Sequence, residues 1–212
     1  RRVKRNIFMK NVITIDGPSG VGKTTIGKEI ANKYNYTFFS SGILYRYVAK
    51  YSYDNDSNNY DEYNLKIDND GNCYINNHNY HDTEIYNKQI NSDSSEIAKD
   101  TKVRELVKAT LLNFYKGVEN GLVIEGRDMG SVVFPNAKHK FYLDADQETR
   151  GKRREDQSDS QETIKEIKQR DHKDMNRKSS PLVVPNDAIV INNTSKTKEE
   201  TIKEIIKKIE LL

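Results

Sequence analysis

The residues best suited to chemistry lie at 17–24, where the chain reads GPSGVGKT. Gly17 and Gly22 permit backbone conformations that other residues resist, so that successive N–H groups can converge on phosphate oxygens. Lys23 adds a positive charge near the transferred phosphate. Thr24 offers a hydroxyl to Mg²⁺ and begins a helix whose positive dipole end faces the anion. This phosphate-binding loop, the P-loop, predicts that the chain binds the phosphates of a nucleoside triphosphate with Mg²⁺.

Arginine-rich polar clusters occur further along the chain, in the segments SSGILYR, EGRD, RGKRRE and RDHKDMNR. Guanidinium groups match phosphate oxygens in both geometry and charge. Many arginines around one P-loop predict transfer to a second phosphate, because that reaction has more negative charge to neutralise than simple hydrolysis. The residues that we expect to share the crevice are Ser41, Arg46, Arg127, Asp128, Arg150, Arg153, Arg154, Arg170, Asp174 and Arg177.

Short apolar segments alternate with segments of helical periodicity, and this arrangement must position the polar clusters. The apolar segments are often rich in β-branched residues, which is typical of strands covered on both faces. Alternating strands and helices predict an α/β fold with a parallel sheet, whose ligands bind beyond the carboxyl ends of the strands. We expect strands at 12–16, 36–40, 121–125, 139–145 and 188–192. We expect helices at about 23–34, 42–51, 94–116, 147–156, 160–177 and 197–210.

Two regions interrupt the alternation. Residues 52–93 are dominated by Asn, Asp and Tyr, and two alternating runs there flank the turn signal DNDGN. This pattern predicts an inserted β-hairpin. Residues 151–163, GKRREDQSDSQET, are polar and charged throughout, which favours a solvated loop between two helices.

Composition excludes several classes of protein. The chain has 212 residues, enough for one α/β domain with a small insertion. Its 35 basic and 32 acidic residues give a net charge of +3, which is too balanced to favour nucleic acid as a partner. No segment approaches the roughly 18 apolar residues that cross a bilayer, so we expect no membrane partner. The single cysteine excludes an internal disulfide framework and favours the cytoplasm.

The basic residues 1–8 precede Met9, which is a plausible natural start, so we interpret them as an upstream extension or tag remnant. We expect a single domain over 9–212 and a monomer.

Taken together, the motifs resemble those of the bacterial cytidylate kinases, a family of P-loop nucleoside monophosphate kinases. The resemblance runs from about residue 10 to the end of the chain. Its most specific segment is GRDMGSVVFPNA, since other kinases that share the P-loop do not look like this segment. The segments that carry the resemblance are ITIDGPSGVGKTT, SGILYR, KVRELV, GLVIEGRDMGSVVFPNA, FYLDA, the pattern R-D-x-x-D-x-x-R and SPLVVPNDAIVI.

The resemblance implies a fold and a reaction. The fold is the three-layer fold of P-loop NTPases with a five-stranded parallel sheet. Its core would be 9–51 and 94–212, with a monophosphate-binding insertion at 52–93 and a lid at about 151–163. The reaction would be phosphoryl transfer from ATP to CMP or dCMP, in pyrimidine nucleotide metabolism, with Mg²⁺ as the cofactor.

The resemblance also implies roles for individual residues. Arg46 and Arg127 would hold the acceptor phosphate, and Thr24 would face Mg²⁺. ATP would bind through Gly17, Pro18, Ser19, Gly20, Val21, Gly22, Lys23, Thr24, Thr25 and Arg153. CMP would bind through Ser41, Arg46, Ser95, Arg104, Arg127, Asp128, Arg170, Asp174 and Arg177. The catalytic residues would be Lys23, Arg127, Arg150 and Arg154.

The implied assignment of the cytosine site is chemically reasonable. Ser95, Arg104 and Asp128 would face the base, where a carboxylate can accept from the exocyclic amine and an arginine can donate to the ring nitrogen and carbonyl. Uracil presents a carbonyl in place of that amine, so Asp128 should disfavour it. Ser40 departs from the family pattern, which commonly has an aspartate there, and this change affects how Mg²⁺ or its waters are held.

Two other classes of P-loop protein remain as alternatives to a nucleoside monophosphate kinase. A GTP-driven switch needs an N-K-x-D motif, and neither Asn-Lys pair of the chain, at 32–33 and 87–88, is followed by the required aspartate. A kinase that acts on a small-molecule alcohol would need a carboxylate base near its acceptor, and Asp16 is the candidate for that role. A comparison of CMP, dCMP, UMP, AMP and shikimate as acceptors separates these readings.

Overall fold

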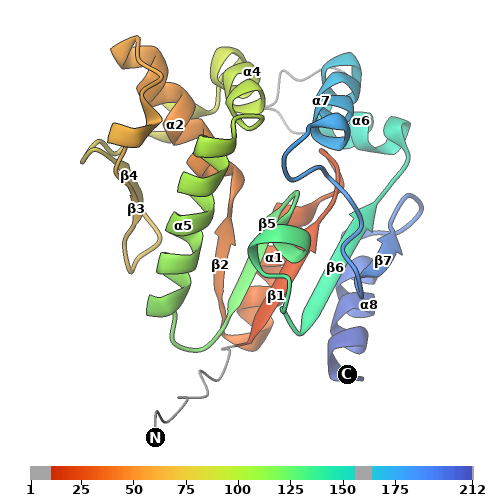
Figure 1. Ribbon diagram of the computed structural model, residues 1–212. Helices are drawn as coiled ribbons and strands as arrows, with labels where there is room; N and C mark the ends of the chain where they lie inside the picture. The colour runs from red at the N-terminus through yellow and green to blue at the C-terminus, as the bar shows by residue number, and fades with distance from the viewer. Residues whose placement is uncertain (1–10, 156–163, 212) are drawn as a thin grey trace, which may run out of the picture.

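In the computed structural model, which describes residues 11–155 and 164–211, a five-stranded parallel sheet lies between two layers of helices (Figure 1). The strand order is β2-β5-β1-β6-β7, with β1 at the centre. The strands are β1 (Val12–Asp16), β2 (Thr37–Ser40), β5 (Leu122–Gly126), β6 (His139–Asp144) and β7 (Ile189–Asn192). This sheet confirms the predicted fold class and all five predicted strands.

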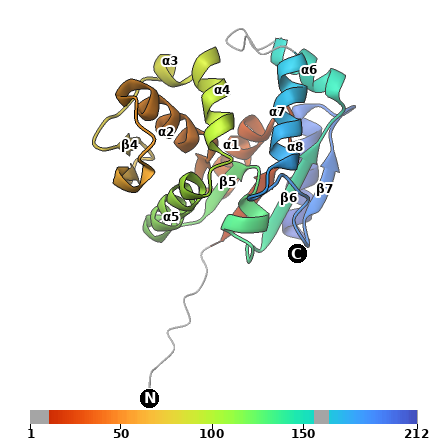
Figure 2. The same ribbon diagram turned by 45° about the horizontal axis from the view of Figure 1, so that its top comes forward.

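Helices cover both faces of the sheet. They are α1 (Lys23–Tyr34), α2 (Gly42–Asn55), α3 (Asp82–Ile85), α4 (Lys88–Ile97), α5 (Thr101–Gly117), α6 (Gln147–Glu155), α7 (Ile164–Asn176) and α8 (Lys198–Glu210). Two shorter turns are η1 (Tyr60–Glu62) and the π-helix η2 (Met129–Val133). Figure 2 shows α4 and α7 together at the end of the sheet, and an ion pair between them confirms that they are neighbours.

The core has two halves, one on each face of the sheet. Ile13 and Ile15 of β1 pack in one buried cluster with residues of α1 and α8. Leu122 and Ile124 of β5 belong to the other cluster, together with residues of α2, α5 and the hairpin. All residues of β1 and β5 are buried, as their largely apolar sequences predict for strands covered on both sides.

Strand register determines which loops meet at the carboxyl end of the sheet. Asp16 of β1 pairs with Gly126 of β5, so the P-loop and the residues after Gly126 start side by side. Ser40 of β2 pairs with Glu125 in the same way. The polar clusters predicted at separate strand ends therefore begin at one edge of the sheet.

The predicted hairpin is present within residues 52–93. Strands β3 (Leu65–Ile67) and β4 (Cys73–Ile75) pair in antiparallel fashion. The connecting turn is held by Asp68, whose carboxylate accepts hydrogen bonds from the backbone N–H groups of Asp70 at 3.0 Å and Asn72 at 2.8 Å. Gly71 supplies the positive φ of 86° that the turn requires.

One predicted helix is wrong. The helix expected at 94–116 is two helices, because the chain turns between Ile97 and Thr101. Asp100 begins α5 by accepting hydrogen bonds from the backbone N–H groups of Lys102 and Val103, which is a typical N-cap. The first helix, α4, begins earlier than expected, since the side chain of Asn87 caps it by accepting from the N–H of Ile90.

Other boundaries also differ from the sequence prediction. Helix α2 continues to Asn55, four residues past the expected end of the first core segment, and α4 lies largely inside the stretch expected to be an insertion. The proposed extension at 1–8 and most of the expected lid, at 156–163, lie outside the described residues. Within the described part of the chain, no helix has both the length and the apolar character needed to cross a bilayer.

Candidate active site

The P-loop joins β1 to α1, and its glycines fulfil the backbone roles predicted for them. Gly17 has a φ of 148°, and a Cβ atom there would lie 2.2 Å from the carbonyl oxygen of Leu143. Gly22 has a φ of 89° and stands immediately before α1. Lys23 is buried, and its Nζ donates a hydrogen bond to the carbonyl oxygen of Pro18 at 2.7 Å. The backbone of the loop therefore folds back to contact the Lys23 side chain.

A pocket of about 620 Å³ opens beside the P-loop. Residues 20–25 line one side of it, and Arg153 and Asn193 line another. Arg153 donates to the side-chain oxygen of Asn193 at 2.9 Å and to its backbone oxygen at 2.8 Å, and Asn193 Nδ2 donates to the carbonyl of Val21 at 2.9 Å. The structure thus places Arg153 at the P-loop, where the sequence predicted it.

Glu125 forms a group of oxygen atoms with two hydroxyls at the base of the P-loop. Its Oε1 accepts hydrogen bonds from Thr24 Oγ1, at 3.0 Å, and from Ser40 Oγ. These three residues come from β5, α1 and β2, and register alone brings Ser40 beside Glu125. Carboxylate and hydroxyl oxygens are hard ligands of the kind that Mg²⁺ takes in nucleotide sites.

Ser41 immediately precedes α2 and Arg46 lies near the start of that helix, as predicted after the second strand. The backbone N–H and the hydroxyl of Ser41 both donate to the carbonyl of Glu125, at 3.0 and 2.9 Å. Arg46, further along α2, donates through Nη1 to the carbonyl of Ile85 at 3.1 Å and to the side chain of Asn91. The segment 85–91 therefore holds Arg46 in place.

Arg127 forms an ion pair with a residue distant in sequence. Its Nε donates to Asp174 Oδ2 at 2.9 Å, and Arg177 Nη1 lies 3.3 Å from the other oxygen of Asp174. Burial by itself would raise the pKa of Asp174, but the charges of Arg127, Arg177 and Arg170 outweigh it and lower that pKa. Helix α7 is thereby joined to the end of β5 by charge.

A second buried ion pair joins Arg104 of α5 to Asp128. The Arg104 guanidinium also lies over the ring of Tyr45, 5.5 Å from its centre. Within the described residues, Arg104 Nε and Arg177 Nη2 are buried donors that no protein atom accepts from. Buried donors are almost always satisfied, so these two donors have hydrogen-bonding capacity that the described residues do not use.

Asp16 is fully buried at the end of β1, where it anchors the π-helix η2. Its two carboxylate oxygens accept hydrogen bonds from the backbone N–H groups of Met129 at 2.9 Å and Gly130 at 2.7 Å. Burial raises the pKa of Asp16 to about 6. Both oxygens are used to hold backbone, so Asp16 positions the segment that follows Arg127 and Asp128.

Arg150 lies beneath the P-loop in a buried network. It donates to the carbonyls of Ala145 at 3.0 Å and Ser19 at 2.9 Å, and it pairs with Asp171. Asp171 in turn accepts the backbone N–H of Ser19 at 3.0 Å. A P-loop N–H is thus bonded to a carboxylate of α7, and Arg150 supports the loop from below in this arrangement.

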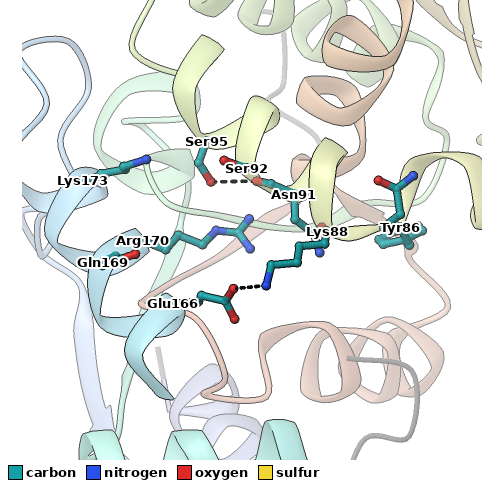
Figure 3. A pocket seen from close by; sticks show the side chains of 10 residues that line it. Tyr86, Lys88, Asn91, Ser92, Ser95, Glu166, Gln169, Arg170 and Lys173 are labelled. Carbon is teal, nitrogen blue, oxygen red and sulfur yellow. Dashed lines mark hydrogen bonds and ion pairs between the residues drawn. The ribbon is translucent and has the colours of Figure 1, made fainter. Parts of the chain in front are cut away.

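A smaller pocket, of about 340 Å³, lies between α4 and α7. Ser95 and Arg170, both predicted site residues, line it from opposite sides, and Arg170 extends from α7 toward α4 (Figure 3). Ser95 Oγ donates to the carbonyl of Asn91 at 3.1 Å. Lys88 of α4 and Glu166 of α7 form an ion pair at 3.0 Å that bridges the two helices.

Comparison with known proteins connects this geometry to a family. The family model for cytidylate kinase matches residues 13–211. This chain belongs to the cytidylate kinase family.

Individual relatives agree with this membership. The chain is 38% identical over 216 residues to a cytidylate kinase of Mesomycoplasma hyopneumoniae, covering 94% of this chain and 93% of that protein. It is 37% identical to a cytidylate kinase of Clostridioides difficile, covering 94% of this chain and 98% of the relative. In fold, it resembles the crystal structure of TT1252 from Thermus thermophilus, with a TM-score of 0.53 and 16% identity, over 94% of this chain and 98% of that one.

Sequence reasoning missed three charged or polar side chains that organise this cytidylate kinase site. Glu125 stands in the segment EGRD, and its place at the end of a strand was a usable signal. Asp171 is the second residue of the pattern R-D-x-x-D-x-x-R, but it was assigned no role in the site. Asn193 follows the last strand and gave no signal, since a single asparagine after a strand is common. The side chain of Arg154, a predicted catalytic residue, lies outside the described part of the chain.

Proposed function

We propose that the chain transfers the terminal phosphoryl group of ATP to CMP or dCMP, giving ADP and CDP or dCDP. The observation that carries the assignment of the base is the buried group of Arg104, Asp128 and Arg177. Asp128 supplies a carboxylate for the exocyclic amine of cytosine. The Arg104 Nε and Arg177 Nη2 donors, which lack an acceptor among the described residues, supply partners for the ring nitrogen and carbonyl.

The acceptor phosphate binds between Arg46 and Arg127 in this proposal. Arg127 is supported by its ion pair with Asp174, which fixes the orientation of the guanidinium through Nε. Ser41 lies at the start of the same helix as Arg46. Arg170 and Asp174 meet the ribose, and Ser95, which lines the smaller pocket together with Arg170, faces the base.

ATP binds in the larger pocket, with its phosphates in the loop at 17–24 and with Arg153 beside them. Lys23 and Arg127 are the cations that we assign to the transferred group. Arg154 completes the set from the lid side, and Arg150 contributes its charge from beneath the P-loop. For Arg150 the supporting observation is its direct hydrogen bond to the Ser19 carbonyl of the P-loop.

The oxygens around Glu125 fit Mg²⁺. The Thr24 hydroxyl is held by Glu125, and Ser40, which stands where relatives commonly carry an aspartate, holds the same carboxylate. When bound with ATP, Mg²⁺ neutralises phosphate charge. The chain contributes one carboxylate and two hydroxyls, and such a partial set suits an ion that keeps waters and phosphate oxygens as its other ligands.

The mechanism needs no general base. The second pKa of a phosphate monoester is about 6, so the attacking oxygen is already mostly ionised at neutral pH. Asp16, the candidate base of an alcohol kinase, has both oxygens bonded to the backbone of η2. Catalysis therefore rests on in-line positioning of two phosphates and on the cations around the group that moves.

A coupled assay that compares CMP, dCMP, UMP, AMP and shikimate as acceptors tests the proposal. We expect CMP and dCMP to be preferred, and Lys23→Ala to lower kcat by about a thousandfold or more while the protein stays folded. Lys33→Ala, an exposed lysine on the same helix, is the matched control and should leave activity unchanged. Preference for UMP or AMP would refute the cytosine assignment, and phosphorylation of shikimate would favour an alcohol kinase.

A further inference from the structure

Tyr86 is a large aromatic residue that the reaction described above does not use. It follows α3 and immediately precedes the asparagine that caps α4. Its exposed fraction is 49%, which is high for a ring that contacts other side chains. It also lines the smaller pocket, at the end away from Lys173 (Figure 3). A half-exposed ring at the edge of a ligand pocket calls for an explanation other than core packing.

The ring of Tyr86 lies against the guanidinium of Arg46, with 4.6 Å between Arg46 Cζ and the ring centre. Arg46 Nη1 also donates to the carbonyl of Ile85 and to the side chain of Asn91. One terminal nitrogen is therefore fixed by two acceptors, while the guanidinium carbon lies over the face of the ring. Together these contacts restrain the Arg46 guanidinium at one nitrogen and at its central carbon.

Stacking suits an arginine that must bind phosphate. A guanidinium donates hydrogen bonds along its edges and in its plane, whereas an aromatic ring contacts its face. The ring therefore attracts the cation without consuming an N–H donor. A tyrosine phenol has an ordinary pKa of about 10, so the ring carries no charge at neutral pH. An ordered guanidinium plane loses less rotamer entropy when phosphate binds.

We propose that Tyr86 is a positioning residue for Arg46, whose guanidinium plane it holds in the orientation that receives the acceptor phosphate. This inference rests on the proposed function, because it takes Arg46 to be a ligand of that phosphate. It assigns the aromatic ring as the active part of Tyr86 and gives the hydroxyl no role.

The test measures binding of CMP and of cytidine, which lacks the phosphate, to the full chain by calorimetry, along with kcat and KM. Tyr86→Leu should weaken CMP binding and raise its KM by about three- to tenfold, in line with partly desolvated cation–π contacts, with a much smaller change in kcat. Cytidine binding should not change. Tyr86→Phe keeps the ring and should behave like the wild type. Tyr53→Leu, at a tyrosine 65% exposed, is the matched control and should have no effect.

A double variant tests whether Tyr86 acts through Arg46. In an Arg46→Ala background, Tyr86→Leu should cause no further loss of CMP affinity, because the group that it orients is gone. Full additivity of the two substitutions would overturn the inference. So would a Tyr86→Phe variant as impaired as Tyr86→Leu, since the hydroxyl would then be the active part.

Failure of the proposed function gives a different result. If the wild type binds CMP no more tightly than cytidine, or if Arg46→Ala leaves CMP binding intact, then Arg46 does not hold the acceptor phosphate. That part of the proposed function then falls together with the inference about Tyr86. If those two results are as expected and Tyr86→Leu still binds CMP normally, only the positioning role of Tyr86 is refuted.

Discussion

Asp16 offers a prediction about how folding stability depends on pH. The carboxylate is fully buried and accepts one backbone hydrogen bond on each oxygen, from Met129 and Gly130. Its pKa in the folded protein is about 6, against an ordinary value of 3.8, and burial is the main cause. The folded state therefore binds this proton more tightly than the unfolded state. The contribution of Asp16 to the free energy of unfolding is fully present below about pH 4 and is lost as the pH rises through 6.

The size of the effect follows from the shift in pKa. Each unit is worth about 1.4 kcal/mol, so the full shift corresponds to about 3 kcal/mol in the free energy of unfolding. About 2 kcal/mol of this lies between about pH 4.5 and pH 7.5, the range in which unfolding is practical to measure. Asp16→Asn removes the titration. It also leaves one backbone N–H of η2 facing an amide NH₂ group, at a cost of roughly 1 to 3 kcal/mol that does not depend on pH.

Urea unfolding of the wild type and of Asp16→Asn across this pH range provides the test. The difference between the two curves cancels the other titrating groups, so it isolates Asp16. We expect the stability of the variant relative to the wild type to increase by about 2 kcal/mol from the acidic to the neutral end. Parallel curves would show that Asp16 has an ordinary pKa in the folded state and would refute this account of the buried carboxylate.

Two further predictions concern the cleft. Glu125→Gln keeps the shape of the side chain but removes the charge that holds Thr24 and Ser40. We therefore expect turnover to fall about 10- to 100-fold and a titration of the rate with Mg²⁺ to show that more Mg²⁺ is needed. An unchanged Mg²⁺ requirement would contradict this role. Lys88→Glu and Glu166→Lys each break the ion pair between α4 and α7. Because Lys88 is exposed and Glu166 only half-buried, we expect each variant to raise KM for CMP only about two- to threefold, mainly at low salt. The double charge reversal should restore the wild-type value. A swap that fails to restore KM would show that the pair does not act as a unit.

The sheet and the P-loop could be predicted because their signals are local. Strand β1 is a short apolar run, and the loop after it is defined by residue types at fixed spacing. Glycine at 17 is required by the conformation and by the nearby carbonyl of Leu143, so the sequence pattern carries the geometry directly. The strand-end location of Arg127 followed from the same reasoning, since the carboxyl ends of parallel strands meet at one edge.

The partners of the arginines could not be predicted, because they depend on how distant helices pack. The sequence predicted only that Arg150 shares the crevice with the other arginines, whereas Arg150 pairs with Asp171 and lies under the P-loop. The break between α4 and α5 was missed for a different reason. No glycine or proline stands between residues 98 and 101 to mark it, and the local signal is Asp100, which caps the start of α5.

Helix α7 connects the two sides of the site. Asp171 on this helix accepts the N–H of Ser19 in the P-loop, and Asp174, three residues later, accepts from Arg127 at the end of β5. Residues three apart lie one above the other on a helix face, and one turn of helix is rigid. A single turn of α7 thus sets the distance between the P-loop, which binds the donor phosphates, and Arg127, which we assign to the acceptor phosphate. A displacement of this helix must move both contacts together, so the alignment of donor and acceptor depends on where α7 packs.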